Sequence, residues 1–398
     1  MSKAFAGVRV LDFTRFLAGP FGTWQFALQG ADVIKIEPHE GDDVRQGQLA
    51  PKWAEQGLSP AFMAISTNKR SLRLDLKKPE AVEIIKRLVV DADIVWENFR
   101  TGVMDRLGLG YEALREANPR LVYCAISGFG QSGPLRDLPA YDQIIQGMAG
   151  VMSITGTEDC APLRVGYPIA DTIGGMTAAF AVAAALADRQ RSAGVFIDVS
   201  MLEATMATMG WAVSNYLVAG REPAPMGNDN VTASPSGTFR TGDGLLNIAA
   251  NKQEQFEAVC QVLGHPEWAG DERFADRFAR LKNRGALKAL LEQAMQQGST
   301  EHWWQALNAA GVPAGPVYSV PQVLQTPQIA TRGMVATYEN VPGVGRDVRL
   351  LRTGFKLNGE APSVASPPPQ LGQHTDEILA DLGYGAADIE SLKQEQAV

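Results

Sequence analysis

Four apolar stretches decide the fold of this chain: VRVLDF at residues 8–13, DVIKIE at 32–37, DIVWEN at 93–98 and LVYCAI at 121–126. Each is short and rich in Val and Ile, a composition typical of buried strands. Segments with a helical pattern separate the later stretches, over residues 79–90 and 103–118, and Pro79 stands where a helix commonly begins. Strands that alternate with helices predict an α/β fold with a parallel sheet covered by helices.

The rest of the chain predicts a second domain, because 398 residues exceed the size at which a single core usually stops growing. A helix is expected over residues 172–189, a strand over VFIDVS at 195–200, and another helix over 202–217. Residues 220–237 are rich in Pro, Gly, Asn and Ser, which favours a linker. A short strand pair around residues 242–244 and charged helices are expected beyond it.

The composition excludes several classes of function. The formal net charge of -8 argues against a nucleic-acid partner, which requires concentrated Lys and Arg. Cys124, Cys160 and Cys260 are too few for a disulfide framework and lack a CxxC spacing, so we expect a reducing, cytoplasmic location. The run that comes closest to a membrane span, at 176–187, has only the length of a buried helix, so we expect no membrane partner.

Common catalytic signatures are missing from the sequence. There is no GxGxxG after the first predicted strand, no GxxxxGK[ST], no GxSxG and no HExxH, and His and Cys do not occur together at a metal spacing. We therefore expect no metal site. With four histidines in the whole chain, a carboxylate that acts as nucleophile or as acid and base becomes comparatively more favoured.

One carboxylate stands out. Asp171, in GYPIADTIGGMTAAFAVAAAL, follows a short apolar run and precedes a Gly-Gly pair that is expected to open a long uncharged helix. On these residues alone an N-cap is the commoner interpretation, since Asp accepts hydrogen bonds from free amides at a helix start. The alternative is a reactive carboxylate, with the amides of Gly174 and Gly175 close enough to hold a developing oxyanion.

Polar and glycine-rich segments follow the predicted strands, where ligands collect in parallel sheets. FTRFLAGP at 13–20 and ENFRTG at 97–102 each leave a strand, and TNKRSLRLDLKKP at 67–79 concentrates basic residues. Such a basic run is usually a solvated face, and contact with a phosphorylated cofactor is the alternative. Tyr141 and Asp142 are either turn residues or part of the same site.

Taken together, these segments resemble the class III CoA-transferase family. That family includes formyl-CoA transferase, carnitine CoA-transferase and succinyl-CoA:glutarate CoA-transferase, and it is related to α-methylacyl-CoA racemase. The similarity covers nearly the whole chain and rests on the order and spacing of VRVLDFTRFLAGP, GADVIKIEPHEGDD, NKRSLRLDLK, ENFRTGVMDRLGLGYE, SGFGQSGP, AYDQIIQGMAGVMSITG, ADTIGGMTAAFAVAAALADR, GVPAGPV and LGQHTDEIL.

The resemblance implies which residues form the site. Asp171 falls on the catalytic aspartate of the family, so it would attack the thioester carbonyl of an acyl-CoA. The positions that match the family's contacts to coenzyme A are Leu17, Ala18, Leu74, Asp75, Lys77, Asn98, Phe99, Arg100, Arg106, Tyr141 and Asp142. Arg106 would meet a phosphate of coenzyme A, a common use of the guanidinium group.

The departures from the family pattern concern the acid that is activated. Arg15, Leu17 and Pro38 stand where formyl-CoA transferase has a histidine, a glutamine and an arginine, which disfavours transfer from oxalate. Arg15 is instead expected to bind the second carboxylate of a dicarboxylic acid such as succinate or glutarate.

The resemblance also implies the assembly. Residues 1–200 and 330–398 would form a Rossmann-like large domain that binds coenzyme A, and residues 225–325 a smaller α+β domain, with linkers at 201–224 and 326–329. Two chains would thread through one another as an interlocked homodimer. The partners would be an acyl-CoA, a carboxylic acid and a second copy of the chain.

Two alternatives to a CoA-transferase remain. Racemisation of a 2-methylacyl-CoA requires two proton-transfer groups on opposite faces of the α-carbon, and the related racemases place a histidine where this chain has Tyr141. A non-catalytic CoA-binding protein is the other alternative, and the presence of Asp171 argues against it.

Overall fold

The computed structural model describes residues 3–47, 50–362 and 365–398. The chain forms two compact units, one of residues 1–151, 164–221 and 330–398 and one of residues 152–163 and 222–329. Residues 152–163 thus belong to the second unit, whereas the sequence placed them in the large domain. Residues 201–219 form helices α9 (Met201–Thr208) and α10 (Gly210–Ala219), which agrees with the helix expected over residues 202–217, within the stretch expected to link the domains.

The first unit is built on a six-stranded sheet in which all neighbouring strands are parallel. Its strand order is β3-β2-β1-β4-β5-β6, the order of a doubly wound Rossmann sheet. The strands are β1 (Arg9–Asp12), β2 (Asp32–Glu37), β3 (Lys69–Arg73), β4 (Ile94–Glu97), β5 (Val122–Ser127) and β6 (Val195–Ser200). The predicted α/β class with a parallel sheet is confirmed.

Strand β3 is one of the elements that the local sequence pattern did not predict. It lies within the basic run at 67–79, for which a solvated face was the favoured interpretation, and that interpretation is wrong for its central part. Lys69 and Leu72 are buried, and β3 pairs with β2 along its length. The strand escaped notice because its charges hide the apolar pattern: Lys69 is buried only because a carboxylate neutralises it.

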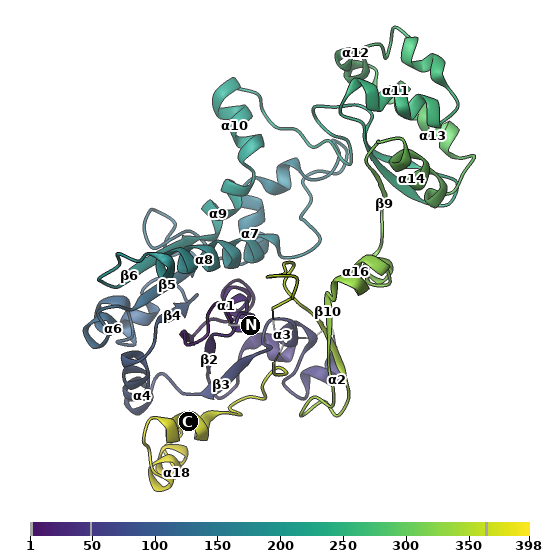
Figure 1. The fold of residues 1–398 in the computed structure, drawn as a ribbon. Coiled ribbons are helices and arrows are strands. Elements are labelled where there is room, and N and C mark those ends of the chain that lie inside the picture. Colours follow the sequence, from purple (N-terminus) through teal and green to yellow (C-terminus); the bar gives the residue numbers. More distant parts are fainter. Residues whose placement is uncertain (1–2, 48–49, 363–364) are drawn as a thin grey trace. The chain divides into compact units, whose positions relative to one another are not determined.

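Helices cover both faces of the sheet, since alternate residues of each strand point to opposite sides. Val10 and Ile94 pack on one face with helices α1 (Ala18–Leu28), α7 (Asp142–Met148), α8 (Ile169–Ala187) and α9. Leu11 and Val95 pack on the other with α4 (Pro79–Val90), α6 (Tyr111–Ala117), α17 (Thr375–Asp381) and α18 (Ala386–Gln394). The C-terminal helices thus complete a layer that begins near residue 79 (Figure 1).

The remaining elements of the first unit are short. They are a 3-10 turn at Asp43–Gln46, helices α2 (Pro51–Ala54), α3 (Pro60–Ala64) and α5 (Val103–Arg106), and the antiparallel pair β10 (Val335–Tyr338) and β11 (Val348–Leu351). A further 3-10 turn, at Val151–Ile154, lies where the chain passes into the second unit. Helix α16 (Pro327–Arg332) lies where the chain returns to this unit.

The second unit combines a small antiparallel sheet with helices. Strands β7 (Ser236–Arg240), β8 (Leu245–Ala249) and β9 (Ala314–Pro316) form the sheet. β7 and β8 are the strand pair expected around residues 242–244, which form the turn between them. The helices are α11 (Gln253–Val262), α12 (Arg277–Lys282), α13 (Arg284–Met295), α14 (Thr300–Ala309) and α15 (Val320–Leu324), with a 3-10 turn at Pro266–Gly270. Its separate apolar core includes Phe256 and Leu291.

Helix α8 is, within the described ranges, the one helix with the length and composition of a membrane span. Composition alone does not distinguish such a span from a core helix of a soluble protein. The helix packs against α1, α7, α9, β5 and β6, which identifies it as part of the helical layer on this sheet.

Candidate active site

The predicted site residues gather at the carboxyl-terminal edge of the sheet. β1 is followed by residues 15–18, β3 by 74–77 and β4 by 98–100. Because β1 and β4 are neighbours while the chain leaves them in opposite directions along the sheet, their ends flank the position at which doubly wound folds bind ligands.

The side chain of Asn98 ties these two strand ends together. The backbone N–H of Arg15 donates to Asn98 Oδ1 at 2.8 Å, and Asn98 Nδ2 donates to the carbonyl of Arg15 at 2.7 Å. The side-chain amide of Asn98 therefore pairs with both backbone polar groups of Arg15, as a neighbouring strand would. One N–H of Asn98 Nδ2 and one lone pair of Oδ1 remain for the expected contact with coenzyme A. The observed role of Asn98 is to hold the β1–α1 loop.

The same loop is held in an unusual backbone conformation. Phe16 has a φ of 62°, in the left-handed region that bulky residues rarely adopt. Its N–H donates to Asp42 Oδ1 at 3.2 Å, and its ring, 39% exposed, lies edge-on to Tyr141 at 5.4 Å. Strain of this kind costs about 1–3 kcal/mol and persists where the surroundings fix it, often at functional sites.

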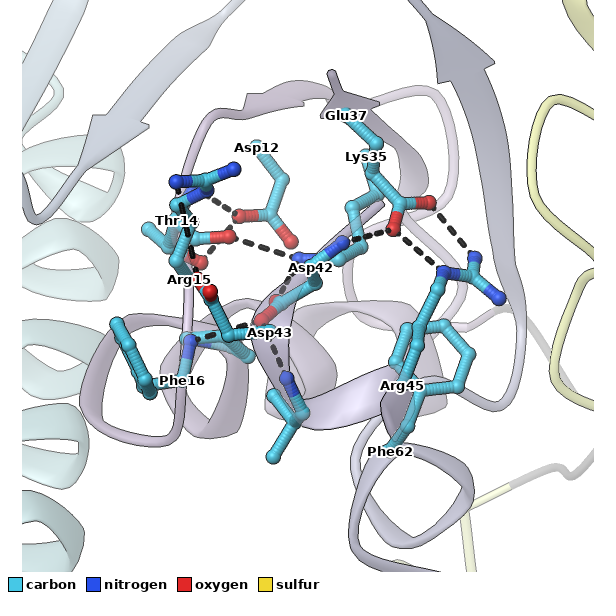
Figure 2. Close-up of polar contacts among 12 residues, drawn as sticks. Asp12, Thr14, Arg15, Phe16, Lys35, Glu37, Asp42, Asp43, Arg45 and Phe62 are labelled. Carbon is cyan, nitrogen blue, oxygen red and sulfur yellow. Dashed lines mark hydrogen bonds and ion pairs between the residues drawn. The ribbon is translucent and has the colours of Figure 1, made fainter. Parts of the chain in front are cut away.

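A cluster of buried charges holds the loop that follows β1 (Figure 2). Lys35 Nζ donates to Asp42 Oδ2 at 2.8 Å and to the carbonyl of Thr14 at 2.7 Å, with both charged side chains 1% exposed. Arg45 forms a two-pronged pair with Glu37, through two contacts of 2.7 Å, and lies over the ring of Phe62. Each cation has a carboxylate at hydrogen-bonding distance, which is the arrangement that offsets the cost of burying charge.

Asp12, at the end of β1, anchors a second part of this cluster. It accepts hydrogen bonds from the side chains of Lys69, at 3.0 Å, and Thr23, at 2.7 Å, and from both the amide and the hydroxyl of Thr14. Burial alone would raise the pKa of Asp12, but the positive charges of Lys69 and Lys35 and these hydrogen bonds hold it below its ordinary value. The carboxylate is thus charged in the folded protein.

Asp171 lies in the first turn of α8 and is not its N-cap. The helix begins at Ile169 with Pro168 as N-cap, so the N-cap interpretation of Asp171 is wrong. In the part of the chain that the structure describes, the Asp171 side chain has no hydrogen-bond or ion-pair partner. Burial raises its pKa to about 7, and the negative charge of Asp142 contributes in the same direction. A half-buried carboxylate without a partner is typical of a functional group.

Gly174 and Gly175 serve helix packing. They lie in the second turn of α8, where amide N–H groups are used within the helix, so the expected oxyanion contacts from these two amides are not available. A Cβ atom on Gly175 would lie 2.3 Å from the carbonyl oxygen of Ala18, and one on Gly174 would lie 2.9 Å from Met201 Cγ. Gly175 thus lets α1 approach α8 one turn after Asp171, and Gly174 lets α9 pack against the same turn.

Asp142 also differs from its expected role. Its side chain is buried, and it accepts from the amide of Ala170 at 2.9 Å and from Gln146 Nε2 at 2.7 Å. Arg164 Nη2 lies 3.6 Å from the same carboxylate. One oxygen therefore accepts from the start of α8 and the other from Gln146 of α7, so the observed role of Asp142 is to hold the first turn of α8, which carries Asp171.

The other expected contacts with coenzyme A divide by exposure. Leu74 is buried in the core, so its side chain is unavailable to a ligand, and Phe99 packs partly against the same core. Asp75 accepts from the amide of Lys77 at 3.1 Å. The exposed members are Lys77, Arg100, Arg106 and Tyr141. The three cations among them follow β3 and β4, where a phosphorylated ligand could reach them.

Two acidic residues of this region were missed. Asp42 and Asp43 follow β2 in EPHEGDD, and the pattern of an acidic pair directly after a strand was the available signal. Asp42 is buried against Lys35, whereas Asp43 is exposed and lies 3.7 Å from Arg15 Nη1.

The second unit has a cleft of its own, of about 590 Å³. Its lining includes the neutral polar side chains of Asn228, Asn230, Thr238 and Asn247, and Asp229 in its wall is paired with Lys288 at 3.3 Å. Such a lining suits amide and hydroxyl groups better than phosphates.

Comparison with known proteins gives a consistent result. The model of CoA-transferase family III matches residues 5–375. A succinate–glutarate CoA-transferase of Agrobacterium fabrum is 38% identical over 95% of this chain and 95% of its own length. An acetyl-CoA:oxalate CoA-transferase of Acetobacter aceti is 40% identical over 87% of this chain and 89% of its own length.

A solved structure has the same fold. The crystal structure of a CAIB/BAIF family protein from Brucella suis superimposes with a TM-score of 0.84 at 36% identity and covers 96% of this chain and 100% of that one. With the six-stranded parallel sheet, the site at its carboxyl edge and a family match over nearly the whole length, the chain belongs to CoA-transferase family III.

Proposed function

We propose that this protein transfers coenzyme A from succinyl-CoA, or another dicarboxylyl-CoA, to a carboxylic acid, with Asp171 as the nucleophile. The observation that carries the proposal is the half-buried carboxylate of Asp171 in the first turn of α8, which has no hydrogen-bond or ion-pair partner among the described residues. A nucleophile must keep a lone pair free, and a carboxylate already engaged in an ion pair would be far less reactive.

In the proposed reaction the activation stored in the donor thioester is retained in an anhydride and then in a new thioester. The Asp171 carboxylate attacks the thioester carbonyl of the donor, the C–S bond breaks, and an aspartyl-acyl anhydride and CoA thiolate result. The thiolate attacks the aspartyl carbonyl, which releases the donor acid and leaves an aspartyl-CoA thioester. The acceptor carboxylate then attacks this thioester and the same steps run in reverse, so that acyl-CoA leaves and the Asp171 carboxylate is restored.

Water must be kept from these intermediates, because hydrolysis of the anhydride or thioester would waste the activation. The burial of Asp171 that raises its pKa supports such surroundings. Oxyanion donors other than the amides of Gly174 and Gly175 are required, because both of these lie within α8.

Arg15 is the residue that favours dicarboxylic acids. Its guanidinium is one-third exposed at the edge of the sheet, on a loop that leads directly into α1 beside α8. An arginine binds a carboxylate in a two-pronged geometry that a monocarboxylic acid, with its single carboxylate at the reacting end, cannot exploit. The relatives named for succinate and glutarate support the same class of acid.

CoA exchange from succinyl-CoA to a panel of mono- and dicarboxylic acids tests the proposal, with chromatography of all acyl-CoA products. Transfer to a dicarboxylate is expected. Arg15→Gln should raise the KM for dicarboxylic acids about tenfold or more, the usual worth of a charge-assisted hydrogen bond, and change the KM for monocarboxylic acids much less. Arg115→Gln, which removes an exposed arginine on α6, is the matched control.

One outcome would reverse the assignment. Absence of transfer to every acid, together with exchange of the α-proton of a 2-methylacyl-CoA, would favour the racemase. Absence of both reactions with retained binding of coenzyme A would favour a non-catalytic binding protein.

The rate should depend on pH in a defined direction. Because only the carboxylate form of Asp171 attacks, and because burial raises its pKa to about 7, kcat/KM is expected to rise with pH through about 7 and then level off. Asp142→Asn removes the neighbouring negative charge and should move this rise to lower pH. An unchanged midpoint in Asp142→Asn, measured between pH 5 and 9, would contradict the electrostatic coupling of the two aspartates.

The assembly and location are also proposals. Apolar side chains are exposed on neighbouring helices of the first unit, among them Met148 on α7, Phe180 on α8 and Trp211 on α10, the last at 91%. An apolar surface of this kind suits burial against a second copy of the chain. We propose a homodimer, interlocked as the family resemblance implies, in the cytoplasm.

A further inference from the structure

We propose that Asp43 is a specificity-determining residue, which competes with the bound acid for the guanidinium of Arg15 and so sets how strongly the site binds a second carboxylate. The inference rests on the proposed function, since it concerns the dicarboxylic acid that Arg15 would bind. In this proposal Arg15 favours binding of the dicarboxylic acid, and Asp43 opposes it.

The first observation is that the backbone around Arg15 is fixed. Asn98 holds both the N–H and the carbonyl of Arg15, Lys35 holds the preceding carbonyl, and Asp42 holds the following N–H. Each of these contacts lies between 2.7 and 3.2 Å. The loop therefore does not need to move when a ligand arrives, and reorientation is left to the long side chain of Arg15.

The second observation is that the neighbouring cations are fully committed. Lys35, Lys69 and Arg45 pair with Asp42, Asp12 and Glu37 at 2.8, 3.0 and 2.7 Å, and all six side chains are between 0 and 2% exposed. Removing a carboxylate from such a pair would leave a buried charge uncompensated, which costs several kcal/mol. These cations cannot exchange their partners for a substrate.

Arg15 differs from these cations both in exposure and in the distance to its carboxylate partner. Its Nη1 lies 3.7 Å from Asp43 Oδ2, beyond hydrogen-bonding distance, and the two side chains are 33% and 54% exposed. An exposed pair of this kind is worth little, so an incoming carboxylate can displace Asp43. Within the cluster of Figure 2, Arg15 is the cation whose partner is exchangeable.

The backbone on either side of Asp43 is also fixed. Its neighbour Asp42 is fixed through its N–H to Glu37 Oε1 at 3.2 Å and through the amide of Val44 to its own side chain at 3.2 Å. These contacts fix the backbone that carries Asp43, whose exposed carboxylate lies 3.7 Å from Arg15 Nη1. Asp43 opposes binding because a second carboxylate must displace it from the guanidinium before it can pair with Arg15.

Replacement of Asp43 by Asn tests the inference, since it keeps the shape and removes the charge. With succinyl-CoA as donor, we expect the KM for glutarate to fall by about two- to fivefold, the range for an exposed ion pair. The preference for glutarate over its monoamide, 4-carbamoylbutanoate, should rise by the same factor, because the monoamide has no charge for Arg15 to bind.

Two further variants separate this effect from a general change in charge. Glu40→Gln removes an exposed carboxylate from the same loop that, among the described residues, makes no ion pair with Arg15, and the preference should stay at the wild-type value. In the Arg15→Gln background, Asp43→Asn should have no further effect. An equal gain for both acids, an equal gain in Glu40→Gln, or a gain that survives Arg15→Gln would overturn the role of Asp43.

Calorimetric titration of glutarate into the protein saturated with coenzyme A distinguishes failure of this inference from failure of the proposed function. Tighter glutarate binding in Asp43→Asn, with no transfer by the wild type, would refute the proposed function and support the role of Asp43. Transfer to glutarate with an unchanged preference in Asp43→Asn would support the function and refute this role.

Discussion

Replacement of Asp171 by Ala is expected to reduce CoA transfer by about 10³-fold or more, because no second group can form the acyl and CoA intermediates in its place. The acidic neighbour cannot substitute for it, since both oxygens of Asp142 are occupied by Ala170 and Gln146. Initial rates from succinyl-CoA to glutarate measure the loss. A fall of less than tenfold would show that another residue is the nucleophile.

Asp188→Ala is the matched control for this experiment. Asp188 lies at the other end of α8 and is exposed, so its removal tests whether any lost aspartate on this helix impairs transfer. Wild-type rates are expected. Hydroxylamine supplied together with succinyl-CoA should in addition convert Asp171 of the wild type to a hydroxamate, detected by mass spectrometry of the peptide, and this product should be absent from Asp171→Ala.

The charge of Asp171 is also expected to lower the folding stability of the protein, so that its removal stabilises the fold. A carboxyl group whose pKa is raised to about 7 by folding stabilises the protein only while it is protonated. That contribution is present below about pH 4 and is lost as pH rises through 7, so at pH 8 the charged Asp171 opposes folding by up to about 4 kcal/mol. Asp171→Asn should therefore melt at a higher temperature than the wild type at pH 8.

Replacement of Asp12 by Ala is expected to lower the stability of the first unit by about 3–5 kcal/mol. The variant would leave Lys69 buried at 0% exposure without its carboxylate, and Thr14 and Thr23 without an acceptor. Hydrogen–deuterium exchange of peptides from β1, β2 and β3 measures the loss locally, which avoids treating two compact units as one cooperative transition.

Two comparisons make this prediction specific. Asp32→Ala removes a partly exposed carboxylate that pairs with Arg70 at 2.7 Å at the start of β2, and it should cost less than about 1 kcal/mol. The double variant Asp12→Leu and Lys69→Met removes both buried charges and should recover most of the stability. The buried pair would not have the stated role if Asp12→Ala cost no more than Asp32→Ala.

Much of the first unit follows from local sequence. The stretches at 32–37 and 195–200 coincide with β2 and β6, and residues 79–90 coincide with α4, because each combines an unambiguous periodicity with a clear start. Asp171 stood out from the residues around it, and the resemblance in segment order then implied the roles of Asp171 and Arg15. Their geometry is a separate matter: the sequence indicated an N-cap and oxyanion glycines, and the structure has neither at these residues.

The sequence by itself determined the α/β class, the parallel sheet and the edge at which polar loops collect, since these depend on patterns within about ten consecutive residues. Only the tertiary structure decided that Lys69 is buried, that Asn98 holds Arg15, that Asp142 holds the start of α8, and that Asp43 faces Arg15. Each of these contacts joins residues 28 to 83 positions apart. Burial of a charge and the position of a side chain depend on what other elements bring next to it, and no local pattern contains that partner.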